Sequence, residues 1–211
     1  QEDEVYYVER IARMPHDYIC YQPPSYLGPV AATPADKNGF ITFGSFSELT
    51  KIQPETIMLW AKVLKAVPDS RFYANNFLLT DEVSQGRLYS LFREAGVGSD
   101  RIIISAGGDH ANFLDQYRYV DLVLDTWPYS GGLTTCEALV MGVPVVTLTG
   151  ERFCGRHATS HLNAAGFPEW AAKDEDSFVK ISLRLAKDPQ ALTELRARVR
   201  DKTLASPLCD I

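Results

Sequence analysis

The residues best suited to chemistry lie at the end of one loop and in the segment that follows it. Gly131 and Gly132 end the loop, the hydroxyls of Thr134 and Thr135 come next, and the carboxylate of Glu137 follows. If a helix begins here, its free amides and the positive end of its dipole would attract an anion. Two hydroxyls and a carboxylate beside such a site suit a nucleoside diphosphate, with the carboxylate on the ribose. The pattern also allows a plainer interpretation, in which the glycines form an ordinary turn and Glu137 only caps the helix.

A lysine and a phenylalanine elsewhere in the chain could complete this site. Lys51 follows an expected strand at residues 40–46, and loops that follow parallel strands open on the same edge of a sheet. There Lys51 could neutralise a diphosphate, although it could also be an ordinary solvated lysine. Phe113 lies in a short expected helix after another glycine-containing loop. It is most simply a core aromatic, and it could stack on a base only if it were partly exposed.

Histidines and cysteines give weaker indications. His157 and His161 are four residues apart, a spacing that can hold a metal, but no acidic third ligand is near in the sequence. We therefore favour capping or packing for both and predict no metal site. The four cysteines lack the clustered spacing of disulfide frameworks and zinc sites, so we expect reduced thiols at Cys20, Cys136, Cys154 and Cys209. Since the nucleophile-elbow, Walker and dinucleotide glycine motifs are missing, the pattern supports only a nucleotide-diphosphate site on a Rossmann-like domain.

The strand before the loop and the helix after it must position these groups. Residues 120–125 (VDLVLD) form a short run rich in β-branched residues, as buried parallel strands do. Thr134 and Glu137 have the spacing of a capping box, which predicts a helix that begins at Thr134. Gly142 would end that helix before the next strand at residues 144–148 (PVVTL).

Strands and helices alternate through the rest of the chain. We predict further strands at residues 40–46, 71–79 and 101–105, and helices at residues 54–67, 81–95, 111–117, 153–165, 175–186 and 189–202. Thr80 is expected to cap the second of these helices. Such alternation predicts an α/β fold with a doubly wound parallel sheet, which is Rossmann-like.

The first 38 residues have a different character. Residues 2–14 carry aliphatic side chains at helical spacing, which predicts one helix. Residues 15–38 contain five prolines with three tyrosines between them, which is typical of an extended but ordered connection. We therefore expect a lead-in segment over residues 1–38 and a Rossmann-like domain over residues 39–211.

Composition places the chain among globular proteins. Of its 211 residues 45% are hydrophobic and 23% are charged, and the net charge is −6. An acidic chain without a basic run is unsuited to nonspecific nucleic-acid binding. The longest apolar run, at residues 138–148, is interrupted by glycine and proline and is too short to cross a bilayer. We expect a cytoplasmic protein with no membrane and no nucleic-acid partner, and the glutamine at position 1 suggests a piece of a longer chain.

Several stretches of the sequence are more specific than a pattern of hydrophobic spacing. The most specific is DTWPYSGGLTTCEALVMGVPVVTLTGERFCGR at residues 125–156, and FGSFSELTKI at residues 43–52 accompanies it. These stretches closely resemble the catalytic C-terminal half of the O-GlcNAc transferase family, which includes SPINDLY-type and bacterial tetratricopeptide-fused glycosyltransferases. VPDSRF, DRIIIS, HLNAAGFPEW and ASPLCD fit in the same register. The similarity covers residues 8–211 without a large insertion.

The resemblance implies a GT-B architecture, in which a sugar nucleotide lies between two Rossmann-like domains. Residues 39–211 would be the C-terminal, nucleotide-sugar-binding domain. The implied activity is inverting, metal-independent transfer of a sugar, most simply from UDP-GlcNAc, to protein serine or threonine, with no cofactor besides the donor. The general base and the repeat region that recruits the protein acceptor would lie in a missing N-terminal part, so this piece should be inactive alone.

The resemblance also assigns roles to single residues. Lys51 matches the family lysine that contacts the diphosphate and is our candidate catalytic group. Glu137 stands where the family has an acidic residue on the ribose, Phe113 stands where family members have a histidine or tyrosine beside the uracil, and His110 lies in the loop whose backbone reads the base. The predicted nucleotide-sugar-binding residues are Lys51, His110, Phe113, Gly131, Gly132, Leu133, Thr134, Thr135 and Glu137.

Two residues depart from the family pattern and leave alternatives open. Leu133 replaces a common threonine, which removes a hydroxyl near the phosphates. Glu48 stands where an amide is usual, and its charge would repel a diphosphate unless it turned outward or paired with Lys51. The alternatives are a non-catalytic module that senses nucleotides or serves as a scaffold, and a GT-B transferase with another donor, such as GDP-fucose or UDP-glucose, or with a lipid or cell-wall acceptor.

Overall fold

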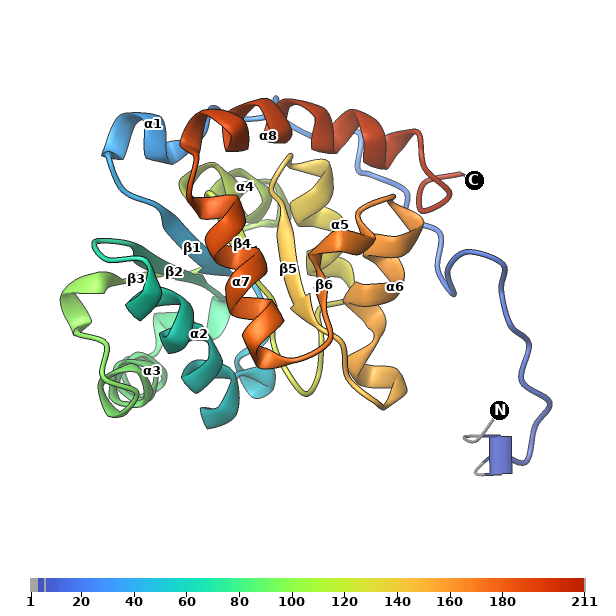
Figure 1. Ribbon diagram of the computed structural model, residues 1–211, viewed down its shortest axis with the longest axis horizontal. Helices are drawn as coiled ribbons and strands as arrows, with labels where there is room; N and C mark the ends of the chain where they lie inside the picture. The colour runs from blue at the N-terminus through green and yellow to red at the C-terminus, as the bar shows by residue number, and fades with distance from the viewer. Residues whose placement is uncertain (1–3, 6, 211) are drawn as a thin grey trace.

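The computed structural model describes residues 4–5 and 7–210, and its centre is one sheet of six parallel strands (Figure 1). The order β3-β2-β1-β4-β5-β6 shows that the chain winds outward from β1 in one direction and then from β4 in the other. This is the doubly wound α/β arrangement that the sequence predicts, so the predicted fold class is confirmed. The strands are β1 Thr42–Ser45, β2 Arg71–Asn75, β3 Ile102–Ser105, β4 Leu122–Leu124, β5 Val145–Leu148 and β6 Ala171–Ala172.

The winding direction reverses between the two central strands. Phe43 and Gly44 of β1 pair in register with Leu122 and Val123 of β4. Both strands are buried throughout, as strands of a parallel sheet with helices on both faces must be. At such a reversal the loops at the carboxyl ends diverge and open a crevice, where sheets of this kind bind ligands.

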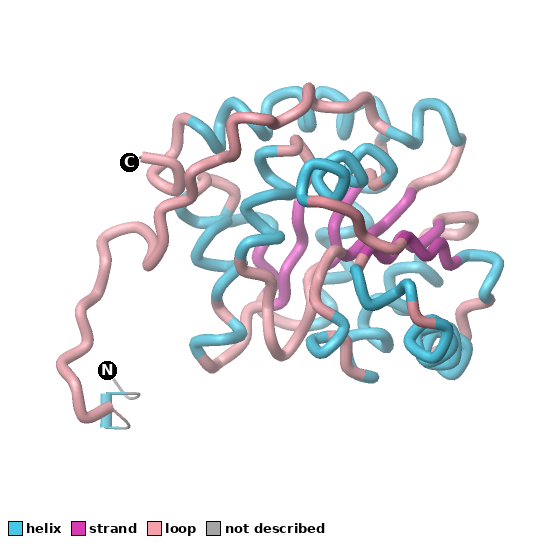
Figure 2. The backbone as a smooth tube through the Cα atoms, turned by 180° about the vertical axis from the view of Figure 1, so that it is seen from behind, coloured by secondary structure: helices cyan, strands magenta, loops and turns pink. Residues whose placement is uncertain are grey.

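Helices cover both faces of the sheet (Figures 1 and 2). One face carries α2 (Pro54–Ala66), α3 (Glu82–Glu94) and α7 (Glu175–Ala186), and the other carries α4 (His110–Asp115), α5 (Leu133–Val140) and α6 (His157–Ala164). Successive strand residues enter opposite cores, because side chains alternate along a strand. Leu122 and Leu124 of β4 belong to the first core, and Val123 belongs to the second.

The amino end of β4 is covered by α8 (Pro189–Leu204), which lies beside α1 (Pro34–Asn38) along the upper edge in Figure 1. The buried Arg196 of α8 donates through Nη1 to the carbonyls of Val120 (2.7 Å) and Asp121 (3.2 Å), just before β4. The contact of Arg196 closes the amino end of β4, whereas the loop at the carboxyl end of this strand leads into α5.

Two predicted helix boundaries are wrong. Asp81, not Thr80, caps α3, because its carboxylate accepts from the Ser84 amide at 2.8 Å. The predicted helix at residues 153–165 is divided, since the loop folds back at Gly155, whose carbonyl accepts from the Gly150 amide at 2.8 Å. The short 3-10 helices are η2 Leu49–Lys51, η3 Phe77–Thr80, η4 Ser99–Arg101, η5 Gln116–Tyr119, η6 Phe153–Gly155 and η7 Pro168–Trp170.

The N-terminal segment also differs from expectation. Residues 4–5 form a 3-10 turn, but residues 7–14 are not helical and Val8 is 98% exposed, so the predicted helix at residues 2–14 is wrong over residues 7–14; residues 1–3 and 6 lie outside the described chain. A short amphipathic pattern forms no stable helix unless its apolar face is buried, and this segment runs away from the domain (Figures 1 and 2). Further on, residues 15–33 form no helix or strand, while residues 34–38, which the sequence also predicts to be extended, form α1; Tyr21 is buried and its amide donates to the Leu208 carbonyl at 2.8 Å.

Candidate functional site

A buried aspartate organises the loop between β4 and α5. Asp125 directly follows β4, and its Oδ1 accepts from the amides of Thr126 (2.8 Å) and Gly131 (2.7 Å). Its Oδ2 accepts from the Thr147 hydroxyl of β5 at 2.6 Å. Burial raises the pKa of Asp125 to about 6, although these donors and the charge of Lys51 favour its ionised form. These bonds fold residues 126–131 back against the end of the sheet and fix where α5 begins.

The first glycine of the loop has a structural role. A Cβ on Gly131 would lie 2.7 Å from the Thr135 hydroxyl and 2.9 Å from Asp125 Oδ1, so no larger residue fits without displacing them. The Gly131 amide is engaged by Asp125, and the Thr135 hydroxyl is buried beneath it. The expectation that both glycines offer free amides therefore holds for Gly132 only.

The N-terminus of α5 is open. Gly132 is its N-cap residue, no side chain caps the helix, and a Cβ on Gly132 would meet nothing within 4 Å. Within the described part of the chain, the amides of Gly132, Leu133 and Thr134 have no acceptor, as first-turn amides lack one unless a cap supplies it. The predicted capping box is wrong, because α5 begins at Leu133 and the Glu137 side chain binds a histidine instead of the helix backbone.

Lys51 reaches this corner from the neighbouring strand. It ends η2, which follows β1, and its Nζ donates to the Ser130 carbonyl at 3.2 Å while lying 4.1 Å from the centre of the Tyr129 ring. Burial lowers the pKa of Lys51, and the charges of Asp125 and the exposed Glu48 oppose that shift. The structure thus brings a half-buried cation beside a helix N-terminus, two features that favour bound anions.

Glu137 lies one turn into α5 and is 1% exposed. Its Oε1 accepts from His110 Nε2 at 2.7 Å, and His110 Nδ1 forms a 2.6 Å hydrogen bond with the hydroxyl of Tyr26. Burial raises the pKa of Glu137, and the hydrogen bond and charge of His110 oppose that shift. The predicted residues Glu137 and His110 therefore meet, and the lead-in adds a third group that sequence reasoning missed.

Phe113 lies beside this group in α4. It is half-buried, packs edge-on against Phe46 with ring centres 5.5 Å apart, and lies parallel to the His110 ring at 6.4 Å. Its partial exposure meets the condition that stacking on a base requires.

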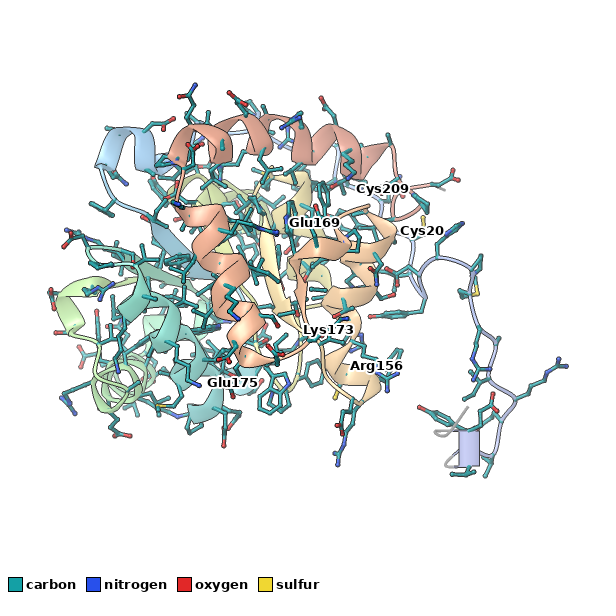
Figure 3. The ribbon with its side chains drawn as sticks, in the orientation of Figure 1. Cys20, Arg156, Glu169, Lys173, Glu175 and Cys209 are labelled. Carbon is teal, nitrogen blue, oxygen red and sulfur yellow. The ribbon has the colours of Figure 1, made fainter. Side chains whose placement is uncertain are left out.

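A cavity of about 650 Å³ adjoins Tyr129 at the same edge of the sheet. Its walls are the loops after β4, β5 and β6, and Lys173 and Glu175 mark this edge in Figure 3. No motif in the sequence indicated this cavity, because its walls come from three separate loops. The cavity is large enough for a sugar or a short stretch of peptide.

The remaining candidates have structural partners. His161 is buried, and its Nδ1 lies 2.6 Å from Asp17 Oδ2, while His157 Nδ1 lies 2.5 Å from the Tyr18 hydroxyl. Both pairs hold the lead-in against α6, which agrees with the packing role favoured for these histidines. All four cysteines are free, although Cys20 and Cys209 lie near each other in Figure 3. Among the described residues, no helix is both long and apolar enough to span a membrane.

Comparisons with known proteins agree on one family. The model of Glycosyl transferase family 41 matches residues 33–211. The chain is 40% identical over 208 residues to the probable UDP-N-acetylglucosamine–peptide N-acetylglucosaminyltransferase SPINDLY of Hordeum vulgare, and 39% identical over 207 residues to that of Arabidopsis thaliana. These alignments cover 97% and 96% of this chain, which spans 22% of the length of either relative.

Solved structures show the same relationship. A mutant of the O-GlcNAc transferase of Thermobaculum terrenum superposes with a TM-score of 0.89 at 34% identity, over 100% of this chain and 39% of that one. The sucrose-phosphate synthase of Thermosynechococcus elongatus superposes with a TM-score of 0.63 over 89% of this chain and 47% of its own. At 16% identity, the second likeness shows the fold alone.

Proposed function

Because this chain belongs to glycosyl transferase family 41 and is an O-GlcNAc transferase-like domain, we propose that it binds the nucleotide-sugar donor of a peptide glycosyltransferase. The proposed donor is UDP-GlcNAc and the proposed acceptor is a protein serine or threonine. The names of the relatives support a UDP-GlcNAc donor and a peptide acceptor. The observation that carries the proposal is the uncapped N-terminus of α5 with Lys51 beside it.

The diphosphate would bind at the corner between Lys51 and α5. Three amides, at Gly132, Leu133 and Thr134, are free to donate to phosphate oxygens, and Lys51 supplies a positive charge at the same corner. As the sugar–phosphate bond breaks, negative charge grows on the β-phosphate, and fixed donors stabilise it more in the transition state than in the ground state. One such donor typically contributes about 3 kcal/mol. We propose that these groups take the place of a metal ion.

The nucleoside would extend from this corner toward α4. The buried carboxylate of Glu137 is suited to accept from the ribose hydroxyls, as the acidic residue of dinucleotide-binding folds does. His110 already engages one of its oxygens, and the half-buried ring of Phe113 would lie beside the base. The sugar and acceptor would then occupy the cavity at Tyr129, whose ring contacts Lys51.

Transfer itself would require a second domain. In the GT-B architecture the donor lies between two Rossmann-like domains, and the present fold supplies one sheet of that kind. We therefore propose that this chain alone binds UDP weakly and transfers no sugar, and that the full protein transfers it with inversion. Sugar transfer by this chain alone would contradict that part of the proposal.

Titration calorimetry with UDP, GDP and ADP tests the donor site. We expect UDP to bind most tightly and Lys51→Ala to weaken it about 10- to 100-fold, since a hydrogen bond from a charged group contributes about 1.5–3 kcal/mol. Lys180→Ala is the matched control, because Lys180 is an exposed lysine of α7 on the opposite face of the sheet from α5. Equal UDP binding by Lys51→Ala and Lys180→Ala would show that Lys51 does not belong to the binding site. Tighter binding of GDP than of UDP would favour a GDP-fucose donor.

One observation favours a second candidate, a module that senses nucleotides without catalysis. Leu133 is 58% exposed at the first position of α5, so an apolar side chain lies where a hydroxyl would help to bind phosphate. Assay of the full protein with UDP-GlcNAc and peptide distinguishes the two candidates. UDP binding without transfer by the full protein would favour the sensing module.

A further inference from the structure

Tyr26 connects the lead-in segment to the proposed nucleotide site. Its hydroxyl lies 2.6 Å from His110 Nδ1, and His110 Nε2 lies 2.7 Å from Glu137 Oε1, so the three side chains form one hydrogen-bonded chain. The Tyr26 and His110 rings meet edge to face with centres 5.8 Å apart. Tyr26 belongs to neither α4 nor α5, and it comes from a part of the chain with no other role in the proposed site.

We propose that Tyr26 is a positioning residue, which acts through His110 to hold Glu137 in the orientation that receives the ribose. This inference rests on the proposed function, since it assigns the ribose to Glu137. Tyr26 itself need not touch the nucleotide.

The direction of the hydrogen bonds follows from what each group can donate. An ionised Glu137 can only accept, so His110 must donate to it from Nε2. A neutral imidazole carries one N–H, and its Nδ1 is then an acceptor for the Tyr26 hydroxyl. Tyr26 thereby stabilises the tautomer that donates to Glu137, just as partners of metal-binding histidines fix their tautomer and ring orientation.

His110 needs such a partner because it is exposed at the surface. Its side chain is 43% exposed, whereas that of Glu137 is 2% exposed. A surface imidazole can rotate or change tautomer, and either change would leave the buried carboxylate without this donor. With one oxygen of Glu137 held by His110, its other oxygen remains able to accept from a ribose hydroxyl.

The backbone around Tyr26 is fixed on both sides. The Tyr21 amide donates to the Leu208 carbonyl at 2.8 Å, and the Leu27 amide donates to the Pro24 carbonyl at 3.3 Å across the turn that carries Tyr26. Val30 further along lies against Gly142, where a Cβ would meet it at 2.5 Å. Docking of the lead-in therefore places the hydroxyl that orients His110.

Tyr26→Phe tests the inference by removing only the hydroxyl. We expect it to weaken UDP binding about fivefold in calorimetry and to leave the weaker binding of 2′-deoxy-UDP nearly unchanged, so that discrimination by the ribose is lost. Tyr119→Phe is the control, because Tyr119 is a similarly exposed tyrosine whose ring contacts Tyr73. In a Glu137→Gln background, Tyr26→Phe should have no further effect on UDP binding.

Side-chain ¹⁵N NMR of His110, assigned with His110→Gln, provides a readout that requires no nucleotide. At pH 8 we expect the Nε2–H tautomer in the wild type and a mixture of tautomers in Tyr26→Phe. If Tyr26→Phe had the same His110 tautomer as the wild type, the role of Tyr26 would be overturned. The same would follow if the wild type bound UDP and Tyr26→Phe bound it with equal affinity. Failure of the wild type to bind UDP together with the expected change of tautomer would instead overturn the proposed function and keep the contact between Tyr26 and His110.

Discussion

Alanine substitutions at the two adjacent glycines should have opposite consequences. At Gly131 the new Cβ would lie 2.7 Å from the Thr135 hydroxyl and 2.9 Å from Asp125 Oδ1. Neither neighbour can easily give way, since Thr135 is buried in α5 and Asp125 is held by Thr126 and Thr147. At Gly132 a Cβ would meet nothing within 4 Å.

The magnitudes follow from these contacts. Overpacking typically costs about 1–3 kcal/mol, and loss of a hydrogen bond to a carboxylate costs about 1.5–3 kcal/mol, so Gly131→Ala should destabilise the fold by about 3 kcal/mol. For a chain of this size that corresponds to a fall in melting temperature of about 6–12 °C. Gly132→Ala should change stability by less than about 0.5 kcal/mol, as surface substitutions usually do. Its methyl group would lie over the free amides, and we expect it to weaken UDP binding about tenfold.

Thermal unfolding followed by circular dichroism, together with UDP calorimetry, measures both effects. The expected result is a low melting temperature for Gly131→Ala, and a normal melting temperature with weak UDP binding for Gly132→Ala. Equal melting temperatures would refute the structural role of Gly131. Wild-type UDP affinity in Gly132→Ala would refute the placement of phosphate over this helix end.

Two further predictions concern the lead-in and the first residue of α5. Burial would raise the pKa of Asp17, but its bonds to His161, Ser160 and the Tyr18 amide lower it overall. A lowered folded-state pKa stabilises the protein above the ordinary value of 3.8, and this stabilisation is lost as pH falls through the folded-state pKa. Asp17→Asn should therefore lower the free energy of unfolding in urea by about 3 kcal/mol at pH 7. Between pH 4 and pH 2 the variant should lose less of its free energy of unfolding than the wild type does. Stability profiles of the two proteins that run parallel over this pH range would contradict this. Leu133→Thr should tighten UDP binding about threefold or more in calorimetry by restoring a hydroxyl, and unchanged affinity would place that side chain away from the phosphates.

Local patterns predicted the elements of this fold well, since each depends on residues close in the chain. The run at residues 120–125, the adjacent glycines and Gly142 predicted a strand, loop and helix, and the structure has β4, the loop and α5 there. Because these patterns involve only neighbouring residues, they also explain the wrong predictions. Thr134 and Glu137 have capping-box spacing, but the Glu137 carboxylate forms its hydrogen bond with His110, which is 27 residues away in the sequence. Residues 2–14 have helical spacing, but of the described part residues 7–10 and 12–14 are exposed, so no buried face stabilises a helix there.

The candidate site was only partly predictable because it is assembled from distant loops. Lys51 could be placed at the correct edge by the rule for parallel sheets, and its contact with the Ser130 carbonyl agrees with that placement. The use of the Gly131 amide by Asp125 could have been suspected from an aspartate directly after a buried strand. Tyr26 gives no such signal, since 84 residues separate it from His110 and no spacing relates them.

The central claim is that a diphosphate binds to the free amides at the start of α5. Its most direct test is amide ¹⁵N–¹H NMR of the chain titrated with UDP and, in parallel, with uridine. We predict that UDP shifts the amide resonances of Gly132, Leu133 and Thr134, while uridine leaves them in place and shifts resonances around Phe113. UDP binding that leaves these three amides unshifted would contradict the account.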